Sequence, residues 1–310
     1  MKSLESIFIT GANGYIGGSI AQKLIKSGRR VRGLVRTKEN ADNLIKLGIE
    51  PVIGDLNDSD LLICEAKLAD GVINTASADH LESVQALIQG LEGSSKPFIH
   101  TSGSSIVGDD VRGSHRSESI FDEYTPLVVE KFKQPRRNID LMVLGAAAND
   151  VRSIVICPSL VYGVGRGLNP KSIQIPFLTE NAQKHGVVQI VGAGLNVWSN
   201  IHIDDVADLY FLALVNAPAG AFYFAENGES SFEQIGAAIA QRLGLASLEK
   251  LNPDVAAQLW GIARAHYSFG SNSRVRSVRA RQELGWIPKH TSVIDWILNE
   301  MPIEVSTIKS

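Results

Sequence analysis

The sequence predicts an α/β fold in which helices cover both faces of a parallel sheet, followed by a smaller second region. Short apolar segments alternate with amphipathic ones through the first half of the chain, the pattern of consecutive strand–helix units. A glycine-rich turn joins the first apolar segment to the first amphipathic one, and the alternation stops after Pro158. At roughly 150 residues per domain, a length of 310 residues also favours two domains.

The first half of the chain supplies the expected sheet and its helices. The segment SIFIT at 6–10 predicts a buried strand, and 16–27 carries Ile16, Ile20 and Leu24 at helical spacing, with Gly28 at its end. The same alternation predicts further strands at 30–35, 51–53, 72–75, 98–101 and 153–156, and helices at 40–47, 59–68 and 81–91. A mostly helical stretch is expected over 127–149, interrupted at Pro135.

The second half has a different rhythm. A glycine-rich loop is expected at 163–169, followed by a helix over 170–185. Further helices are expected at 204–215, with Asp204 as N-cap, and at 231–243, where Ser231 and Gln234 have the spacing of a capping box. These elements indicate a second region built from the last third of the chain plus an insertion around 164–196.

Composition excludes several classes of function. The formal net charge is −3, from 30 basic and 33 acidic residues, which argues against a nucleic-acid or anionic-membrane binder. Cys64 and Cys157 are far apart and match no metal-ligand spacing. We find no signal-peptide core at the N-terminus and no apolar run of about 18 residues. We therefore expect a soluble, cytoplasmic protein with a small-molecule substrate, without a metal, a membrane or a nucleic-acid partner.

The turn after the first strand is a candidate phosphate-binding site. It reads TGANGYIG at 10–17, with glycines spaced as GxxGxxG between a predicted strand and a predicted helix. Backbone N–H groups and a helix N-terminus would there face a pyrophosphate. A glycine-rich turn without a ligand is the alternative. The candidate cofactor residues of this turn are Gly11, Asn13, Gly14, Tyr15, Ile16 and Gly17.

The end of the second strand indicates the type of dinucleotide. A carboxylate that binds the ribose is expected about 20 residues after the glycines, but Val35 and Arg36 stand there and no carboxylate precedes Glu39. Arg36, helped by Lys38, could pair with a 2′-phosphate. One charge-assisted hydrogen bond of about 1.5–3 kcal/mol corresponds to a roughly tenfold to hundredfold preference. The sequence thus favours NADP over NAD, unless Arg36 is merely a solvated surface residue.

Segments spread over nearly the whole chain resemble one family. They are TGANGYIGG at 10–18, GDL at 54–56, DGVINTASA at 70–78, CPSLVYG at 157–163, WSNIHIDDVA at 198–207 and ARQELGWIP at 280–288. In order and spacing they resemble the extended, epimerase/dehydratase-like branch of the short-chain dehydrogenase/reductase superfamily.

The resemblance implies a Rossmann-type doubly wound parallel sheet with a small C-terminal substrate-binding domain. The cofactor domain would comprise 1–163 and a return segment at 197–220, and the substrate region 164–196 and 221–310. Substrates would lie between the two, and a homodimer is common in this family. The further cofactor contacts that it implies are Asp55, Leu56, Thr75, Ala76, Ser77, Thr101 and Pro158.

The family's usual catalytic residues are incomplete in this chain. Family members use a Ser or Thr together with a Tyr-x-x-x-Lys pair, and no tyrosine here has a lysine four residues later. Counting back from Asp140, which occupies the family's usual acidic position, puts Phe132 at the Tyr position and Arg136 at the Lys position. Arg136 can keep a positive charge near the ribose, whereas Phe132 cannot transfer a proton. Losing a positioned acid typically costs about 10²–10⁴ in rate.

Other hydroxyl groups are candidates for the missing chemistry. Gly103 takes the usual Ser/Thr position, so Ser102 or Ser104 could bind the substrate oxygen, or both could bond only backbone or cofactor. Tyr124 and Tyr162 are candidate acids, although packing is the alternative for Tyr162. Two hypotheses remain open. The first is an NADP-dependent oxidoreductase of a small carbonyl, alcohol or sugar derivative with a non-standard active site, and the second is a non-catalytic dinucleotide-binding redox sensor or interaction protein.

Overall fold

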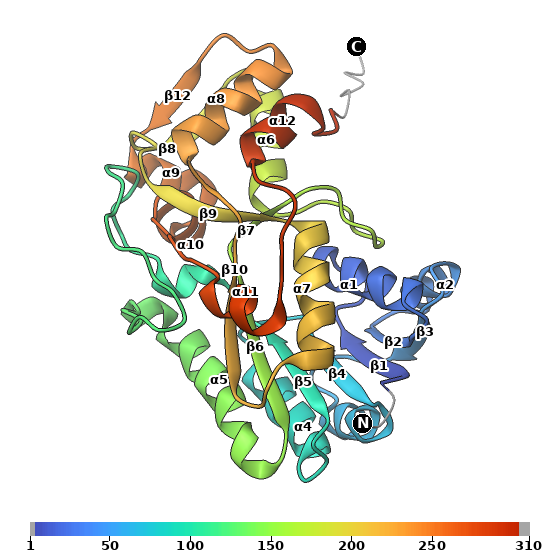
Figure 1. Cartoon of the computed structure of the whole chain (residues 1–310). Helices are drawn as coiled ribbons and strands as arrows, with labels where there is room; N and C mark the ends of the chain where they lie inside the picture. Colours follow the sequence, from blue (N-terminus) through green and yellow to red (C-terminus); the bar gives the residue numbers. More distant parts are fainter. Residues whose placement is uncertain (1–3, 304–310) are drawn as a thin grey trace.

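A seven-stranded parallel sheet forms the centre of the molecule (Figure 1). The computed structural model describes residues 4–303. The strand order is β10-β6-β5-β4-β1-β2-β3, and every neighbouring pair is parallel. The doubly wound α/β fold is thereby confirmed. The strands are β1 (Ser6–Thr10), β2 (Arg30–Val35), β3 (Glu50–Ile53), β4 (Gly71–Asn74), β5 (Pro97–Thr101), β6 (Arg152–Pro158) and β10 (Ala221–Ala225).

Helices cover both faces of this sheet because alternate side chains of each strand point to opposite sides. Ile7 and Ile9 of β1 join one apolar core with α1, α2 and α7, whereas Phe8 joins a second core with α3, α4 and α5. The order of the strands places β4 and β2 on either side of β1, so the first strand lies near the centre of the sheet. The helices are α1 (Tyr15–Lys26), α2 (Lys38–Lys46), α3 (Ser59–Leu68), α4 (Leu81–Leu91), α5 (Gln134–Gly145) and α7 (Ile203–Asn216).

A smaller region lies beyond the carboxyl ends of the strands, in the upper part of Figure 1. Its own apolar core is separate from the two cores of the large sheet. Two small sheets belong to it: β11 (Glu229–Ser231), β9 (Val197–His202) and β7 (Leu160–Tyr162) form one, and β12 (Leu248–Leu251) pairs with β8 (Val188–Val191) in the other. Its helices are α6 (Gln174–His185), α8 (Phe232–Leu243), α9 (Pro253–Trp260), α10 (Ile262–Arg264) and α12 (Val293–Asn299).

The boundary between the regions differs in detail from the expected one. Strand β10, at 221–225, completes the edge of the large sheet, beyond the expected end of the return segment at 220. Helix α11 (Val278–Leu284) packs with β10 through Ala280 and Leu284, in the core that also holds α1, α2 and α7. The chain therefore crosses between the regions more often than the resemblance implies.

Three local predictions need correction, and one is confirmed. Pro135 does not interrupt a helix; it lies in the first turn of α5, where its missing N–H costs no hydrogen bond. Asp204 does not cap α7, since its backbone N–H instead donates to Nδ1 of the capping residue His202 at 3.2 Å. Helix α6 begins at Gln174 rather than 170. Ser231 and Gln234 do form the predicted capping box. Within residues 4–303, none of the helices combines the length and apolarity of a membrane span.

Candidate cofactor and substrate site

Two hollows meet at the turn between β1 and α1, at the carboxyl edge of the large sheet. The first, of about 450 Å³, is bordered by the turn and by the ends of β2 and β3. The second, of about 320 Å³, lies beside the first turn of α1, the ends of β5 and β6 and the small region. Gly14 borders the first hollow, and the next residues, Tyr15 and Ile16, border the second. Together they form an elongated groove where open α/β sheets bind ligands.

The turn itself fits a pyrophosphate. Gly14 caps α1 without any side-chain hydrogen bond, so the first N–H groups of the helix keep their donor capacity. Gly11 has a φ of +77°, and a Cβ there would lie 2.8 Å from the backbone of Ala76. A Cβ at Gly17 would lie under 3.0 Å from the carbonyl oxygen of Gly11 and from Thr75 Oγ1. The glycines thus leave the space that a phosphate would need and let α1 lie close to the residues that follow β4.

The first hollow brings together residues that the sequence predicts to contact the adenosine half of a dinucleotide. Val35, Arg36, Asp55 and Leu56 line it together with Asn13, Thr75 and Ala76. Arg36 is exposed, and within residues 4–303 its guanidinium takes part in no ion pair or hydrogen bond. The one carboxylate among the lining residues, Asp55, accepts the backbone N–H of Asn57 at 2.7 Å. Lys38 is exposed at the start of α2 and does not border this hollow.

The second hollow gathers hydroxyl and cationic groups over the ends of β5 and β6. The predicted site residues that border it are Tyr15, Ile16, Ser102, Ser104, Arg136 and Pro158. Sequence reasoning missed Ser105, Lys133 and Tyr267, which border it too. No Asp, Glu or His is among its lining residues in the part of the chain that the structure describes.

Ser102 is tied to a buried polar cluster beneath the hollow. Its hydroxyl donates to Asp140 Oδ2 at 2.9 Å. His100 Nε2 lies 4.0 Å from Asp140 Oδ1, too far for a hydrogen bond, and both side chains are fully buried. Burial raises the pKa of Asp140 to about 7, while burial and the nearby Arg136 lower the pKa of His100 to about 4. Between these values both groups are neutral, so they face each other without forming an ion pair.

The Asp140 carboxyl makes the stability of the fold depend on pH. In the unfolded chain this group loses its proton near pH 4, whereas in the folded chain it keeps the proton up to about pH 7. Folding therefore becomes less favourable as pH rises through this window, with no further change above it. This decline in the free energy of unfolding amounts to on the order of a few kcal/mol, and we expect it to be absent in Asp140→Asn. Urea unfolding of both proteins at pH 4.5 and 7.5 measures it. The contribution of His100 has the opposite sign, but it is present in both proteins and cancels when the variant is compared with the wild type. If the two proteins show the same change in unfolding free energy between these pH values, the assignment to Asp140 is wrong.

The neighbouring serines have different hydrogen-bond partners. Ser104 lies within hydrogen-bond distance of Ser273 Oγ at 2.8 Å, and Ser273 donates its own hydrogen to the Ser104 carbonyl oxygen. The hydrogen of Ser104 therefore goes to Ser273. Ser105 instead accepts from Lys133 Nζ and from Arg136 Nη1, each at 3.3 Å. Ser105 is the serine of this hollow that is flanked by two cations.

Of the two residues at the family's Tyr and Lys positions, Arg136 borders the hollow and Phe132 does not. Arg136 reaches the hollow and binds Asp79 through two hydrogen bonds, of 2.8 and 2.5 Å. This pair lowers the pKa of Asp79. Phe132 is exposed and stacks on Tyr267, with ring centroids 4.7 Å apart. The Phe132 ring thus packs against the 265–269 segment, and Lys133 occupies the hollow instead.

The remaining predicted residues lie outside both hollows. Tyr124 is exposed and contacts Gln282, whereas Tyr162 is buried against His202 and Trp296, and burial raises its pKa. Thr101 Oγ1 pairs with the Tyr210 hydroxyl at 2.7 Å. Ser77 Oγ accepts the backbone N–H of Asp79. None of these groups contacts the space where a cofactor or substrate would lie, so we expect no direct chemical role for them.

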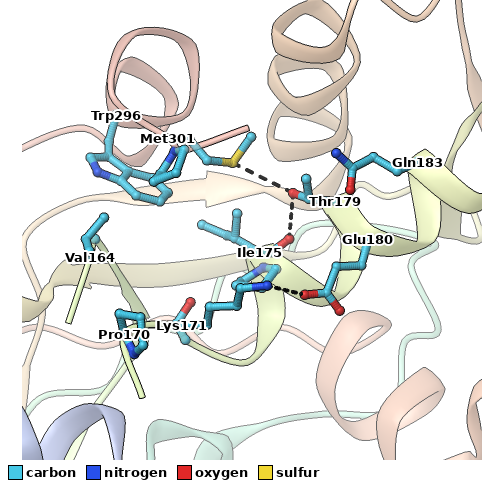
Figure 2. Close-up of a pocket in the computed structure, with 13 residues that line it drawn as sticks. Val164, Pro170, Lys171, Ile175, Thr179, Glu180, Gln183, Trp296 and Met301 are labelled. Atoms are coloured by element: carbon cyan, nitrogen blue, oxygen red, sulfur yellow. Dashed lines mark hydrogen bonds and ion pairs between the residues drawn. The ribbon is translucent and has the colours of Figure 1, made fainter. Parts of the chain in front are cut away.

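A third hollow belongs to the small region alone. Figure 2 shows it between α6, the C-terminal segment and the loop that precedes α6. Its volume is about 190 Å³, and Ile175, Trp296 and Met301 supply apolar walls. Thr179, which also lines it, donates to the Ile175 carbonyl oxygen at 2.9 Å. Ser172 is the only residue that it shares with the second hollow, and it holds none of the predicted site residues.

Comparison with known proteins places the chain in a family. Residues 7–223 match the model of the NAD dependent epimerase/dehydratase family. The oxidase ucsJ of Acremonium sp is 31% identical, with 92% of this chain and 93% of that protein covered. A 4-hydroxy-2-methyl-3-oxo-4-farnesyl-3,4-dihydroquinoline-1-oxide ketoreductase of Stigmatella aurantiaca is 24% identical, with 92% of each chain covered.

The fold agrees with solved structures of the same kind. The dTDP-glucose 4,6-dehydratase of Bacillus anthracis, in complex with NAD, superimposes with a TM-score of 0.73 at 20% identity, covering 93% of this chain and 92% of that one. The family model and the relatives together indicate an oxidoreductase- or epimerase-type enzyme. The chain belongs to the NAD-dependent epimerase/dehydratase family, in the extended branch of the short-chain dehydrogenase/reductase superfamily.

Proposed function

We propose that the protein is an NADPH-dependent reductase of small ketones or aldehydes with apolar substituents. The observation that carries the proposal is the second hollow. It combines hydroxyl and cationic groups, which suit a carbonyl oxygen, with apolar walls from Ile173, Trp198 and Tyr267. Its described lining includes no carboxylate or imidazole, which are common bases for removing a carbon-bound proton in a dehydratase. Simple reduction of a carbonyl group is the chemistry that these residues support.

The relatives are consistent with this choice. The Stigmatella protein is named a ketoreductase of a farnesylated quinoline, and the Acremonium protein an oxidase. Both names describe redox chemistry, and the substrate named for the ketoreductase is not a sugar nucleotide. When bound, the nicotinamide supplies a hydride to the carbonyl carbon. The chain's residues bind the dinucleotide, exclude water and hold the carbonyl oxygen.

The choice of NADPH rests on Arg36. Its guanidinium lines the adenosine end of the groove, and Val35 precedes it where NAD-binding members of the fold place a carboxylate. We expect Arg36→Ala to weaken NADPH binding about tenfold to hundredfold, the value of one charge-assisted bond, and to leave NADH binding unchanged. Fluorescence titration with each nucleotide measures both affinities.

Arg30→Ala is the matched control, because Arg30 lies at the opposite end of the same strand. We expect it to leave both affinities unchanged. Equal affinity of the wild-type protein for NADH and NADPH would show that Arg36 is a solvated side chain without a cofactor role.

The activity is tested by following NADPH absorbance with the protein in excess over NADPH. The carbonyl panel contains 2-alkanones, β-keto esters, aryl ketones and keto-sugars. We expect oxidation with the apolar ketones and little with the sugars. Binding of NADPH without oxidation by any carbonyl would favour the redox-sensor hypothesis instead.

A further inference from the structure

We propose that Ser105 and Lys133 form the proton-donating pair of this active site, in which Ser105 hydrogen-bonds the substrate carbonyl oxygen and Lys133 supplies the proton. This inference rests on the proposed function. It assigns the acid that the family's tyrosine position, held here by Phe132, does not provide. Ser105 and Lys133 both border the second hollow.

The hydrogen-bond geometry of Ser105 leaves its own hydrogen available. Its oxygen accepts from Lys133 Nζ and from Arg136 Nη1, each at 3.3 Å. A hydroxyl oxygen has two acceptor sites and one donor hydrogen. With both acceptor sites used, the hydrogen turns to another partner, and within residues 4–303 no group accepts it. Two cationic donors also polarise the O–H bond and strengthen it as a donor.

Several other hydroxyl groups of the hollow are hydrogen-bonded elsewhere, among them Ser159, which donates to the Ala225 carbonyl oxygen at 2.9 Å. Ser102 donates to Asp140, and Ser104 is paired with Ser273. The Tyr15 hydroxyl donates to the Gly163 carbonyl oxygen at 2.9 Å, and burial raises its pKa. Tyr267 is the one remaining phenol, and its ring is stacked on Phe132. Ser172, Ser268 and Tyr267 line the hollow too, and their hydroxyls also lack an acceptor within residues 4–303. Ser105 differs from them because it is the hydroxyl to which both Lys133 and Arg136 donate.

Lys133 is placed to return the proton that Ser105 gives up. Lys133 is the last residue of a short 3₁₀ helix, Lys131–Lys133, which directly precedes α5. Its ammonium lies 5.4 Å from the centre of the Phe132 ring. Burial and the charge of Arg136 lower the pKa of this ammonium to about 8, against a smaller opposing effect of Asp79. Tyr267, of the 265–269 segment, lines the same hollow. A lysine of this pKa is protonated at neutral pH and still a competent acid.

The proposed step balances in atoms and charge. The carbonyl carbon accepts a hydride from the reduced nicotinamide, and its oxygen takes the Ser105 proton, which yields an alcohol. Ser105 recovers a proton from the Lys133 ammonium, and the resulting amine is reprotonated by water. Arg136 keeps its charge throughout, because Asp79 holds it in place.

The test uses three variants of the full chain and the apolar ketone reduced best. Lys133→Met removes the ammonium, Lys133→Arg keeps the positive charge without a transferable proton, and Lys131→Met is the matched control. Lys131 belongs to the same 3₁₀ helix, is exposed and does not border the hollow. We expect both Lys133 variants to lose about 10²–10⁴ in kcat, with NADPH affinity within threefold of wild type and the control unchanged. The wild-type kcat should fall above about pH 8, and this limb should be absent in both variants.

A measurement without turnover supports the same assignment. In protein labelled with ¹³C at lysine Cε, the resonance lost in Lys133→Met should titrate near pH 8, below the ordinary lysine value of about 10.4. An ordinary titration, or Lys133→Arg with wild-type kcat and pH profile, would overturn the proposal. Ser105→Ala with wild-type kcat would overturn the relay through Ser105. Failure of wild type to reduce any carbonyl while it binds NADPH would instead overturn the proposed function, and this inference with it.

Discussion

Replacing Gly17 with alanine is expected to weaken NADPH binding by at least about a hundredfold. A Cβ at this position would lie under 3.0 Å from the Gly11 carbonyl oxygen and from Thr75 Oγ1. Neither contact is easily relieved, because Gly14 donates its N–H to that carbonyl at 2.8 Å and Thr75 donates to the Thr10 carbonyl at 2.7 Å. The helix must move away from the turn, and the N–H groups that face the phosphates move with it. Overpacking of this kind typically costs a further 1–3 kcal/mol of stability.

The matched control is Gly145→Ala. Gly145 ends α5, and a Cβ there would meet no atom within 4 Å. This variant should bind NADPH as the wild type does. It should be no less stable, because alanine has a higher helix propensity than glycine. Fluorescence titration gives the affinities and thermal unfolding the stabilities. Wild-type affinity of Gly17→Ala would show that the spacing between this helix and this turn is not what binds the cofactor.

The strand, glycine turn and helix at the start of the chain could be predicted because their signal is local. The three glycines, the strand before them and the helix after them all lie within 6–26. Each requirement, a tight turn and a close helix contact, is met by residue type and spacing alone. The same holds for Arg36, which directly follows a strand whose bounds match the predicted ones.

The centre of the second hollow could not be predicted in the same way. Counting from Asp140 assumes one regular α-helix, but 131–133 form a 3₁₀ turn before α5 begins. Residues in a 3₁₀ turn advance by about 120° rather than about 100°, so Phe132 lies against Tyr267 and Lys133 reaches the hollow. Ser105 was missed for a related reason. Strand β5 ends at Thr101, and a 3₁₀ helix at Ser104–Val107 brings Ser105 to the cations.

Contacts between distant segments also escape sequence reasoning. Arg136 and Asp79 are 57 residues apart, and nothing in either local sequence indicates that they pair. Strand β10 pairs with β6 and so extends the large sheet beyond β6, a pairing between segments more than 60 residues apart. The expected end of the cofactor domain, at residue 220, falls directly before this strand.

Asp205→Ala is expected to lower the free energy of unfolding by about 2–5 kcal/mol. The Asp205 carboxylate is buried on α7 and accepts the backbone N–H groups of Lys289 and His290, each at 2.9 Å. It also lies 3.0 Å from His290 Nδ1, while the Asp205 carbonyl accepts the indole N–H of Trp286 at 3.0 Å. Alanine leaves two backbone donors without a partner, and each such loss costs about 1–3 kcal/mol.

The position of Asp205 makes the loss more than local. Helix α7 packs in the core of the large sheet, whereas 286–290 leads from α11 to α12 of the small region. The Asp205 carboxylate therefore holds 286–290, the segment that links the large sheet to the small region, against α7. Thermal unfolding should show a decrease in Tm on the order of 5–10 °C.

Asp208→Ala is the matched control. Asp208 lies on the same helix in a partly exposed ion pair with Lys23, and removing this ion pair should cost no more than about 1 kcal/mol. Equal effects of the two substitutions would mean that the Asp205 hydrogen bonds do not stabilise the junction.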